Sequence, residues 1–459
     1  MKKRIHFIGI GGIGVSALAK YYLKKGWQVL GSDLTASEIT IQMKNLGAKV
    51  HIGKPKASLI TTKIEKVIFS PAVPRNHPER MAARKKKIQE LSYPKALGEL
   101  TKKHYTIAVS GTHGKSTTTA MLGLLLTKAG LDPTVIVGTR LKEFGNSNCR
   151  VGKSKYLVIE ADEHFASFLN YRPQIIILTS LEADHLDFYK TLENLIKTFK
   201  KYVRLLPKDG IVVANRDDKN VQKVLKGFKK EIIWYSKKHK GAKKVKSALW
   251  IPGEHNVSNA LSVLKVARLL NVPDKKSLEA LSQFKGSWRR FELFSLKKPK
   301  PYTLVSDYGH HPTEIKVTIE ATREKWPKKN IWLVYQPHQY QRTFYLFKDF
   351  VRVLSRLPIQ KLLLMDIYDV AGREEKAIRG KVSSQKLIEK IQMMPKRMMP
   401  KRDLGFPKSR LGAPKEVLYI PTADQVKAYL KRNLTGGEVV VVMGAGDIYQ
   451  NLTLRLCSG

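Results

Sequence analysis

Short apolar runs recur along this chain, and glycine or polar residues follow each of them. Runs of this length, bounded by turn residues, are typical of buried β-strands. Longer segments between them read as helices, such as 15–24, which Gly26 closes, and 117–126, which Gly130 closes. This alternation predicts α/β domains. The predicted strands are 5–8, 27–30, 105–109, 156–159, 175–178, 302–305, 331–335, 362–365, 417–420 and 439–443.

The loop after the strand 105–109 has the residues of a phosphate cradle, Gly111-Thr112-His113-Gly114-Lys115-Ser116. Free backbone N–H groups and the positive end of a helix dipole would both point at an anion there. Lys115 is placed to reach the β/γ-phosphates of a nucleotide, and the Ser116 hydroxyl to bind Mg²⁺. The general P-loop pattern would put glycine at Val109, and the bland alternative is an ordinary strand–turn–helix corner. We expect an ATP site, with Lys115 on an exposed loop where its removal leaves stability little changed.

A second glycine-rich loop, Gly9-Ile10-Gly11-Gly12-Ile13-Gly14, follows the first predicted strand. It satisfies G-x-G-x-x-G, and the next strand ends in Gly31-Ser32-Asp33, with a carboxylate at the right distance for a ribose. The motif alone would suggest NAD. This half of the chain therefore leaves open a dinucleotide or another nucleotide, and with it an NAD-dependent oxidoreductase.

Acidic residues follow two predicted strands in a chain that is poor in acids. Glu160-Ala161-Asp162-Glu163 follows 156–159, and Glu182-Ala183-Asp184-His185-Leu186-Asp187 follows 175–178. Carboxylates and an imidazole on the edge that carries a P-loop suit a nucleotide-bound Mg²⁺, although solvated loop acids are the alternative. Asn256, at the start of a predicted helix, either meets a base or phosphate or merely caps that helix.

The last third repeats the pattern of a strand followed by a polar loop. The segments that follow are Asp307-Tyr308-Gly309-His310-His311-Pro312-Thr313-Glu314, Gln336-Pro337-His338-Gln339-Tyr340-Gln341-Arg342-Thr343 and Gly444-Ala445-Gly446-Asp447. Because ligands of open α/β sheets bind outside the carboxyl ends of strands, this predicts a third α/β domain with a functional edge.

Composition limits the number of domains and the class of protein but does not identify a reaction. The 459 residues predict two to four domains, no run approaches the ~18 apolar residues of a membrane helix, and Cys149 and Cys457 form no metal or disulfide pattern. We expect a soluble, cytoplasmic protein with no membrane partner. A net charge of +46 would suit a nucleic-acid binder, but no recognised motif accompanies the dispersed lysines. We favour a lysine-rich surface without a specific nucleic-acid partner, with weak polyanion binding at low salt.

Taken together and in order, these motifs resemble those of the Mur ligases from end to end. The resemblance also rests on Gly253-Glu254-His255-Asn256 and Arg289-Arg290-Phe291-Glu292. It implies an α/β fold of three domains: a Rossmann-like domain for a UDP-sugar (1–102), a central P-loop ATPase-type domain (103–286) and a Rossmann-like domain for an amino acid (287–459). The family's own P-loop has glycine where Gly111 stands, which accounts for Val109.

The resemblance also implies an activity. It implies an ATP- and Mg²⁺-dependent ligase of peptidoglycan precursor synthesis, and so of cell-wall biogenesis, cell shape and cell division. The lactyl carboxylate of UDP-N-acetylmuramate attacks the γ-phosphate, and the amine of L-alanine displaces phosphate from the acyl phosphate. The enzyme would be a monomer or a homodimer. A murein-peptide ligase, which attaches a tripeptide to the same sugar nucleotide, is the alternative, although it typically carries Phe-Ala where this chain has Tyr308-Gly309.

The residue roles that the resemblance implies fall into five groups. They are catalytic residues (Lys115, His185, Arg290, His310, Arg342), ATP-binding residues (Gly111, Thr112, His113, Gly114, Lys115, Ser116, Thr117, Asn256, Arg290), UDP-sugar-binding residues (Gly9, Gly11, Gly12, Gly14, Ser32, Asp33), amino-acid-binding residues (Tyr308, His310, His338, Gln339, Arg342) and metal ligands (Ser116, Glu160, His185).

The sequence departs from the family's pattern in places. The family usually has a second arginine at the position of Gln339, and threonine is common at Ser116. A tandem repeat, 393–402, begins a basic, proline-rich stretch that runs to Pro414. Such a composition cannot build a core, so we expect a surface insertion over about 392–415, between a helix and the strand 417–420.

Overall fold

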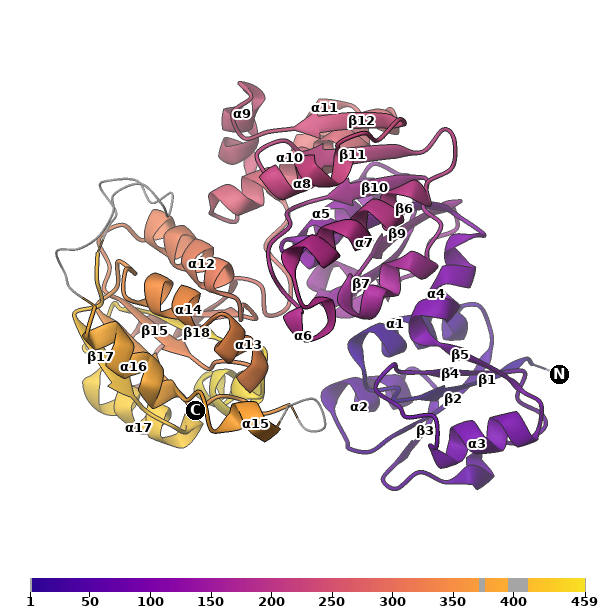
Figure 1. The fold of residues 1–459 in the computed structure, drawn as a ribbon, viewed down its shortest axis with the longest axis horizontal. Helices are drawn as coiled ribbons and strands as arrows, with labels where there is room; N and C mark the ends of the chain where they lie inside the picture. Colours follow the sequence, from indigo (N-terminus) through magenta and orange to yellow (C-terminus); the bar gives the residue numbers. More distant parts are fainter. Residues whose placement is uncertain (1, 371–375, 395–411, 459) are drawn as a thin grey trace. The chain divides into compact units, whose positions relative to one another are not determined.

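The computed structural model describes residues 2–370, 376–394 and 412–458. These residues form three β-sheets within two compact units (Figure 1). The first unit comprises Met1–Glu182, Glu193–Leu249 and Ser258–Phe284, and the second comprises Ala183–Leu192, Trp250–Val257 and Lys285–Gly459. No helix among the described residues is long and apolar enough to cross a membrane.

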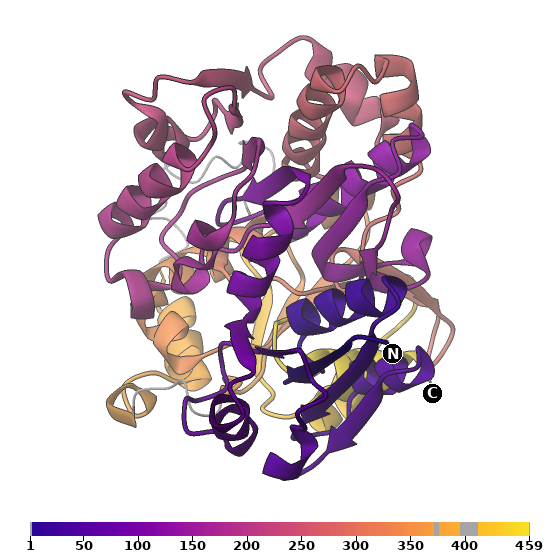
Figure 2. The ribbon, with the colours of Figure 1, turned by 90° about the vertical axis from the view of Figure 1, so that its right-hand side faces the viewer.

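The first sheet has five parallel strands in the order β3-β2-β1-β4-β5. Chain direction across the sheet reverses between β1 and β4, and loops at such a switch point are where ligands of α/β sheets bind. The glycine-rich segment 9–14 follows β1 and runs into helix α1, which begins at Ile13 (Figure 2). The elements are β1 (Arg4–Ile8), α1 (Ile13–Lys24), β2 (Gln28–Asp33), α2 (Glu38–Asn45), β3 (Lys49–Ile52), β4 (Lys66–Phe69), α3 (Pro78–Lys85), β5 (Gln89–Ser92) and α4 (Tyr93–Thr101).

The second sheet has seven strands in the order β12-β11-β10-β6-β9-β7-β8, all parallel except the β7–β8 pair. Its central strands are buried, as their continuous apolar runs predict. The elements of this part are β6 (Tyr105–Ser110), α5 (Lys115–Lys128), β7 (Thr134–Leu141), β8 (Ser147–Arg150), β9 (Tyr156–Glu160), β10 (Ile175–Leu178), α6 (Leu186–Tyr189), α7 (Leu192–Arg204), β11 (Ile211–Asn215), α8 (Lys219–Leu225), β12 (Glu231–Tyr235), α9 (Gly241–Ala248), α10 (Glu254–Leu269) and α11 (Asp274–Ser282).

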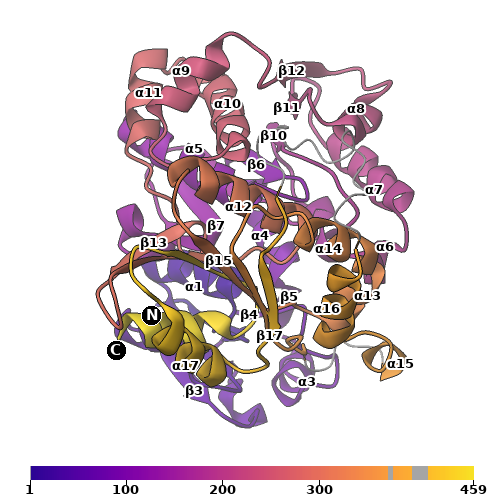
Figure 3. The ribbon, with the colours of Figure 1, turned by 90° about the vertical axis from the view of Figure 1, so that its left-hand side faces the viewer.

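The third sheet lies in the second unit and has the order β13-β14-β18-β15-β16-β17, with only the β13–β14 pair antiparallel. Alternate residues of its strands pack against α12, α14 and α16 on one face and against α17 and the C-terminal helices on the other (Figure 3). The elements are β13 (Glu292–Leu296), β14 (Tyr302–Asp307), α12 (Pro312–Lys325), β15 (Ile331–Tyr335), α13 (Tyr340–Tyr345), α14 (Phe347–Leu354), β16 (Lys361–Leu364), α15 (Lys376–Arg379), α16 (Ser384–Gln392), β17 (Glu416–Tyr419), α17 (Ala423–Asn433), β18 (Val439–Met443) and α18 (Arg455–Cys457).

Three α/β sheets confirm the predicted fold class. The predicted strands 175–178, 331–335 and 439–443 have the observed bounds, whereas β2 runs on to Asp33 and α5 begins two residues earlier than predicted, at Lys115. The basic stretch 393–414 lies between α16 and β17, as expected, but its residues 395–411 lie outside the described residues.

Candidate active site

The glycine-rich loop after β1 is held from inside the first unit. The backbone N–H of Gly11 donates to Asp33 Oδ2 (2.8 Å), and the N–H of Gly9, at φ +77°, donates to the Ser32 carbonyl (2.8 Å). A Cβ on Gly14 would lie 2.8 Å from Tyr93 Cζ, so the close approach of that ring requires glycine. The predicted ribose carboxylate, Asp33, therefore also fixes the conformation of the loop.

The Ser32 hydroxyl is engaged within the first unit. Ser32 is 4% exposed and its hydroxyl donates to Glu79 Oε2 (2.7 Å), which also lies 2.7 Å from His6 Nε2. The expected contact of Ser32 with a UDP-sugar therefore stays a prediction.

The P-loop joins β6 to α5 and has the geometry of a phosphate cradle. Gly111 and Gly114 have φ values of +135° and +82°, in the left-handed region that glycine adopts freely. A Cβ on Gly111 would lie 2.2 Å from Thr179 Oγ1. Thr112 Oγ1 accepts from the Glu182 N–H (2.9 Å), and Thr117 lies in the first turn of α5. The loop backbone is thus fixed at the N-terminus of a 14-residue helix.

Lys115 is not on an exposed loop, which corrects the sequence-based expectation. Its side chain is 12% exposed, and its Nζ donates to Glu163 Oε2 (2.8 Å) and Oε1 (3.0 Å) and to the Gly111 carbonyl (2.7 Å). Burial alone would lower the pKa of Lys115, but Glu163, Asp162 and Glu160 raise it above its ordinary value. The lysine therefore stays charged, with a buried carboxylate as counter-ion.

Two of the three predicted metal ligands meet beside the P-loop. Ser116 Oγ donates to Glu160 Oε1 (2.9 Å), while Glu160 Oε2 accepts from the Gly138 N–H (2.7 Å). The third, His185, belongs to the second unit, where it precedes α6 in a left-handed conformation (φ +52°).

One residue near the P-loop was missed from the sequence. A Cβ on Gly114 would lie 2.5 Å from Asn259 Oδ1, so this amide lies directly over the loop. Asn256 is three residues earlier on α10, and residues at this spacing share a helix face, which is the signal that would have found Asn259. The Asn256 amide donates to the Pro252 carbonyl (2.6 Å), a bond that does not cap the N–H groups of α10, and its expected role at the nucleotide stays a prediction.

His113, another predicted ATP-binding residue, lies with Nε2 3.5 Å from Glu182 Oε2.

In the second unit, the loops after β14 and β15 bring the predicted amino-acid-binding residues together. The rings of Tyr308 and His310 lie 5.5 Å apart, and those of His310 and His338 lie 5.8 Å apart. The guanidinium of Arg290 lies 5.0 Å from the Tyr308 ring centre and 3.6 Å from Glu314 Oε1. Imidazoles and a guanidinium thus gather at the carboxyl edge of the third sheet.

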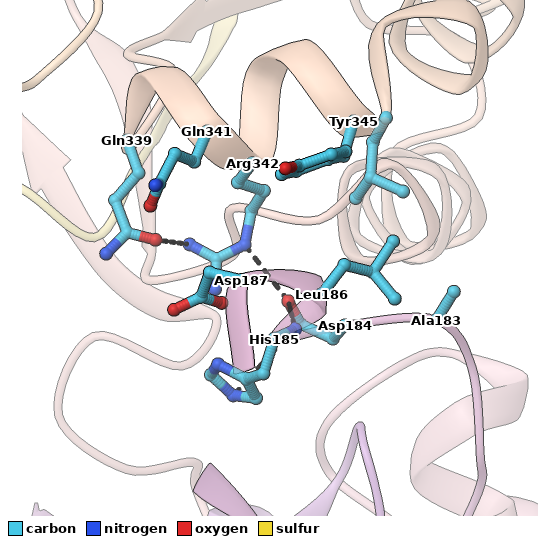
Figure 4. Close-up of a pocket in the computed structure, with 10 residues that line it drawn as sticks. Ala183, Asp184, His185, Leu186, Asp187, Gln339, Gln341, Arg342 and Tyr345 are labelled. Carbon is cyan, nitrogen blue, oxygen red and sulfur yellow. Dashed lines mark hydrogen bonds and ion pairs between the residues drawn. The ribbon is translucent and has the colours of Figure 1, made fainter. Parts of the chain in front are cut away.

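Arg342, on α13, is paired with a residue that sequence reasoning did not select. Its Nε donates to Asp184 Oδ1 (3.2 Å) and its Nη1 to Gln339 Oε1 (3.1 Å), in a pocket that the 183–187 segment and α13 line (Figure 4). Burial alone would raise the pKa of Asp184, but the adjacent Arg342 guanidinium holds it well below its usual range. Asp184 is therefore a buried carboxylate that stays charged.

Two more residues at the carboxyl edge of the third sheet, His310 and Asp307, have shifted pKa values. Burial, with Arg342 and Arg290, lowers the pKa of His310 to about 3, so this imidazole is neutral and acts as a hydrogen-bond partner rather than a cation. Burial raises the pKa of Asp307 to about 6, although its two oxygens accept from the backbone N–H groups of Gly309 (2.7 Å) and Phe291 (2.9 Å).

The first unit thus carries a P-loop, and the second carries a cluster of imidazole and guanidinium groups, an arrangement that suits a nucleotide-using α/β enzyme. The family models identify the class: "Mur ligase family, catalytic domain" matches residues 4–105, "Mur ligase middle domain" matches 109–267, and "Mur ligase, glutamate ligase domain" matches 289–446. The chain belongs to the Mur ligase family.

Comparison with individual relatives shows which members of the family the chain is similar to. The chain is similar to a UDP-N-acetylmuramate–L-alanine ligase from Clostridium kluyveri, with 37% identity over 471 positions that cover 98% of this chain and 96% of the relative. It is also similar to the crystal structure of a UDP-N-acetylmuramate–alanine ligase from Thermotoga maritima, with a TM-score of 0.76 and 25% identity over 99% of this chain and 98% of that one. The chain also shares its fold with the crystal structure of a murein peptide ligase from Psychrobacter arcticus. The TM-score is 0.70, with 22% identity over 99% of this chain and 98% of that one.

Proposed function

We propose that this protein is an ATP-dependent ligase that joins L-alanine to the lactyl carboxylate of UDP-N-acetylmuramate, in cytoplasmic synthesis of peptidoglycan precursors. The observation that carries the proposal is the P-loop with Lys115 and the Ser116–Glu160 pair, in a chain 37% identical to such ligases over 98% of its length. The domain bounds 1–102, 103–286 and 287–459 belong to the same proposal.

The residues beside the P-loop fit a Mg²⁺ ion. A serine hydroxyl and a carboxylate 2.9 Å apart are hard oxygen donors, and such an ion takes one or two protein ligands besides phosphate oxygens and water. We propose Ser116, Glu160 and His185 as its ligands. When bound, Mg²⁺ supplies positive charge to the transferring phosphoryl group.

The chain's own residues would carry out the remaining tasks. Phosphoryl transfer needs positioning and charge neutralisation more than covalent help, so Lys115 would hold the β/γ-phosphates and Arg290 would add a second cation. The carboxylate attacks the γ-phosphorus and ADP leaves; the alanine amine then attacks the acyl carbon and phosphate leaves. Arg342, with Gln339 and His338 beside it, would hold the α-carboxylate of alanine. Because an acyl phosphate hydrolyses in water, the site must exclude solvent at that stage.

A murein-peptide ligase is the competing function. Tyr308-Gly309 before the His310-His311 pair, and the identity to alanine ligases, favour L-alanine. Phosphate release should be measured with ATP, Mg²⁺ and UDP-N-acetylmuramate against L-alanine, other amino acids and the tripeptide L-alanyl-γ-D-glutamyl-meso-diaminopimelate. L-Alanine should give the highest kcat/KM. A higher kcat/KM for the tripeptide would replace the proposal with the competing one.

A further inference from the structure

The pocket between the 183–187 segment and α13 holds a carboxylate to which the proposed reaction gives no role. Asp184 is 8% exposed at its side chain and Arg342 is 7% exposed, and both belong to the second unit. A charge that is this deeply buried needs a partner, and each of these two side chains supplies the other's.

Asp184 and two neighbours together determine how the Arg342 guanidinium lies. Asp184 Oδ1 accepts from Nε (3.2 Å), and Gln339 Oε1 accepts from Nη1 (3.1 Å) (Figure 4). His338 Nδ1 also lies within reach of Nη1 (3.3 Å). No hydrogen bond recorded in the described part of the chain uses Nη2. The guanidinium is therefore fixed along one edge, and its Nη2 end remains for a ligand.

The Asp184 carboxylate also stabilises its own segment. Its Oδ1 accepts from the backbone N–H of His185 (2.8 Å), the residue whose φ of +52° places it in the left-handed region. One oxygen atom thus holds both the turn that begins α6 and the arginine on α13.

We propose that Asp184 is a positioning residue for the amino-acid substrate: it holds Arg342 so that the free Nη2 end meets the substrate α-carboxylate. This inference rests on the proposed function, because it takes Arg342 as the group that receives that carboxylate. Asp184 itself carries negative charge and does not touch the substrate carboxylate; it acts through the guanidinium. Without Asp184, a buried guanidinium lacks its counter-ion and would turn toward solvent, away from the substrate.

Steady-state kinetics of Asp184→Asn, Asp184→Ala, Arg342→Lys and the Asp184→Ala/Arg342→Lys double variant test the inference. Asp184→Asn retains an acceptor for the His185 N–H and is the variant least disturbed in fold. We expect Asp184→Ala to raise the KM for L-alanine on the order of 10- to 100-fold, the range for a charged hydrogen bond, with a smaller rise for Asp184→Asn. The KM for ATP should change less than about twofold, a split that general damage to the fold would not produce.

The double variant separates positioning from a general charge effect. If Asp184 acts only through Arg342, the double variant should have the alanine KM of Arg342→Lys alone. If the rise in alanine KM of the double variant equals the product of the rises of the two single variants, the inference is overturned. Asp187→Asn is the matched control, because it removes the same charge from a residue that lines the same pocket but makes no hydrogen bond or ion pair with Arg342 within the described part of the chain. An equal rise in alanine KM for Asp187→Asn would also overturn it.

Failure of the proposed function gives a different result. If Arg342→Lys leaves the KM for L-alanine unchanged, Arg342 is not the carboxylate-binding residue and the parent assignment is wrong. If Arg342→Lys raises that KM while both Asp184 variants behave as wild type, only the role of Asp184 is wrong.

Discussion

Removal of the Lys115 side chain should both inactivate and destabilise the protein. Lys115 Nζ makes two hydrogen bonds to the Glu163 carboxylate (2.8 and 3.0 Å) and lies within hydrogen-bonding distance of the carbonyls of Gly111 (2.7 Å) and Thr112 (3.3 Å). Glu163 is 1% exposed at its side chain, and Lys115 is 12% exposed. Lys115→Ala would leave Glu163 as a buried carboxylate without this counter-ion.

The structure sets the size of the effect. Removing one partner of a buried ion pair typically costs about 3–5 kcal/mol, because the remaining charge loses its counter-ion in a low-dielectric interior. Asp162, 3.8 Å from Nζ, is 53% exposed and adds little, since water screens it. A loss of about 3 kcal/mol in the free energy of unfolding would lower the Tm of a domain the size of the proposed central domain, 103–286, by roughly 6–12 °C.

The assay compares thermal unfolding and turnover of Lys115→Ala, Glu163→Gln and the Lys115→Ala/Glu163→Gln double variant. Lys115→Ala should lose activity on the order of 10³-fold, through lost charge at the phosphates. The double variant should regain most of the lost Tm, because no charge remains buried, and none of the turnover. A wild-type Tm for Lys115→Ala would refute the reasoning on the buried pair, and near-normal turnover would refute the ATP-site assignment.

Three other predictions concern the second unit and the basic insertion. The pKa of Asp307, raised by burial from 3.8 to about 6, means that the folded state binds this proton more tightly; its contribution to stability is therefore full below about pH 4 and is lost as the pH rises through 6. The free energy of unfolding of wild type minus that of Asp307→Asn should fall by roughly 2–3 kcal/mol from pH 4 to pH 8, and a flat difference would contradict the shift. Gln339→Arg should lower the KM for L-alanine several-fold and leave that for ATP unchanged, because a charged donor replaces a neutral one, even though the bond from Arg342 to Gln339 Oε1 is lost; a higher alanine KM would show that Gln339 does not face the carboxylate. Replacing 393–414 with a Gly/Ser linker should leave kcat intact and weaken only low-salt binding to polyanions, whereas a large fall in kcat would show that the insertion takes part in catalysis.

Strands and glycine turns could be predicted from sequence because each depends on local signals. Continuous apolar runs are what a parallel strand buried on both faces requires, which is why 331–335 and 439–443 matched the observed strands. The start of α5 lies two residues before the predicted one because Gly114 caps that helix without a side-chain hydrogen bond, so the sequence carries no capping signal there.

The partners of the charged residues could not be predicted. Asp184 and Arg342 are 158 positions apart, and Lys115 and Glu163 are 48 apart, so only the folded chain brings them together. The same limit applies to the bond from the Ser32 hydroxyl to the buried Glu79, which lies 47 positions away in the sequence. The motifs therefore locate the functional loops, while the counter-ions that hold each side chain come from tertiary structure.

The central claim is that the muramate carboxylate is activated as an acyl phosphate and then captured by L-alanine. UDP-N-acetylmuramate labelled with ¹⁸O in its lactyl carboxylate should be incubated with the protein, ATP, Mg²⁺ and L-alanine, and the phosphate and nucleotide products analysed by mass spectrometry. The account predicts that one carboxylate ¹⁸O passes to the released phosphate, while the sugar nucleotide gains one alanyl residue and keeps the other ¹⁸O. Released phosphate without ¹⁸O, or a sugar nucleotide that gains no alanine, would contradict it.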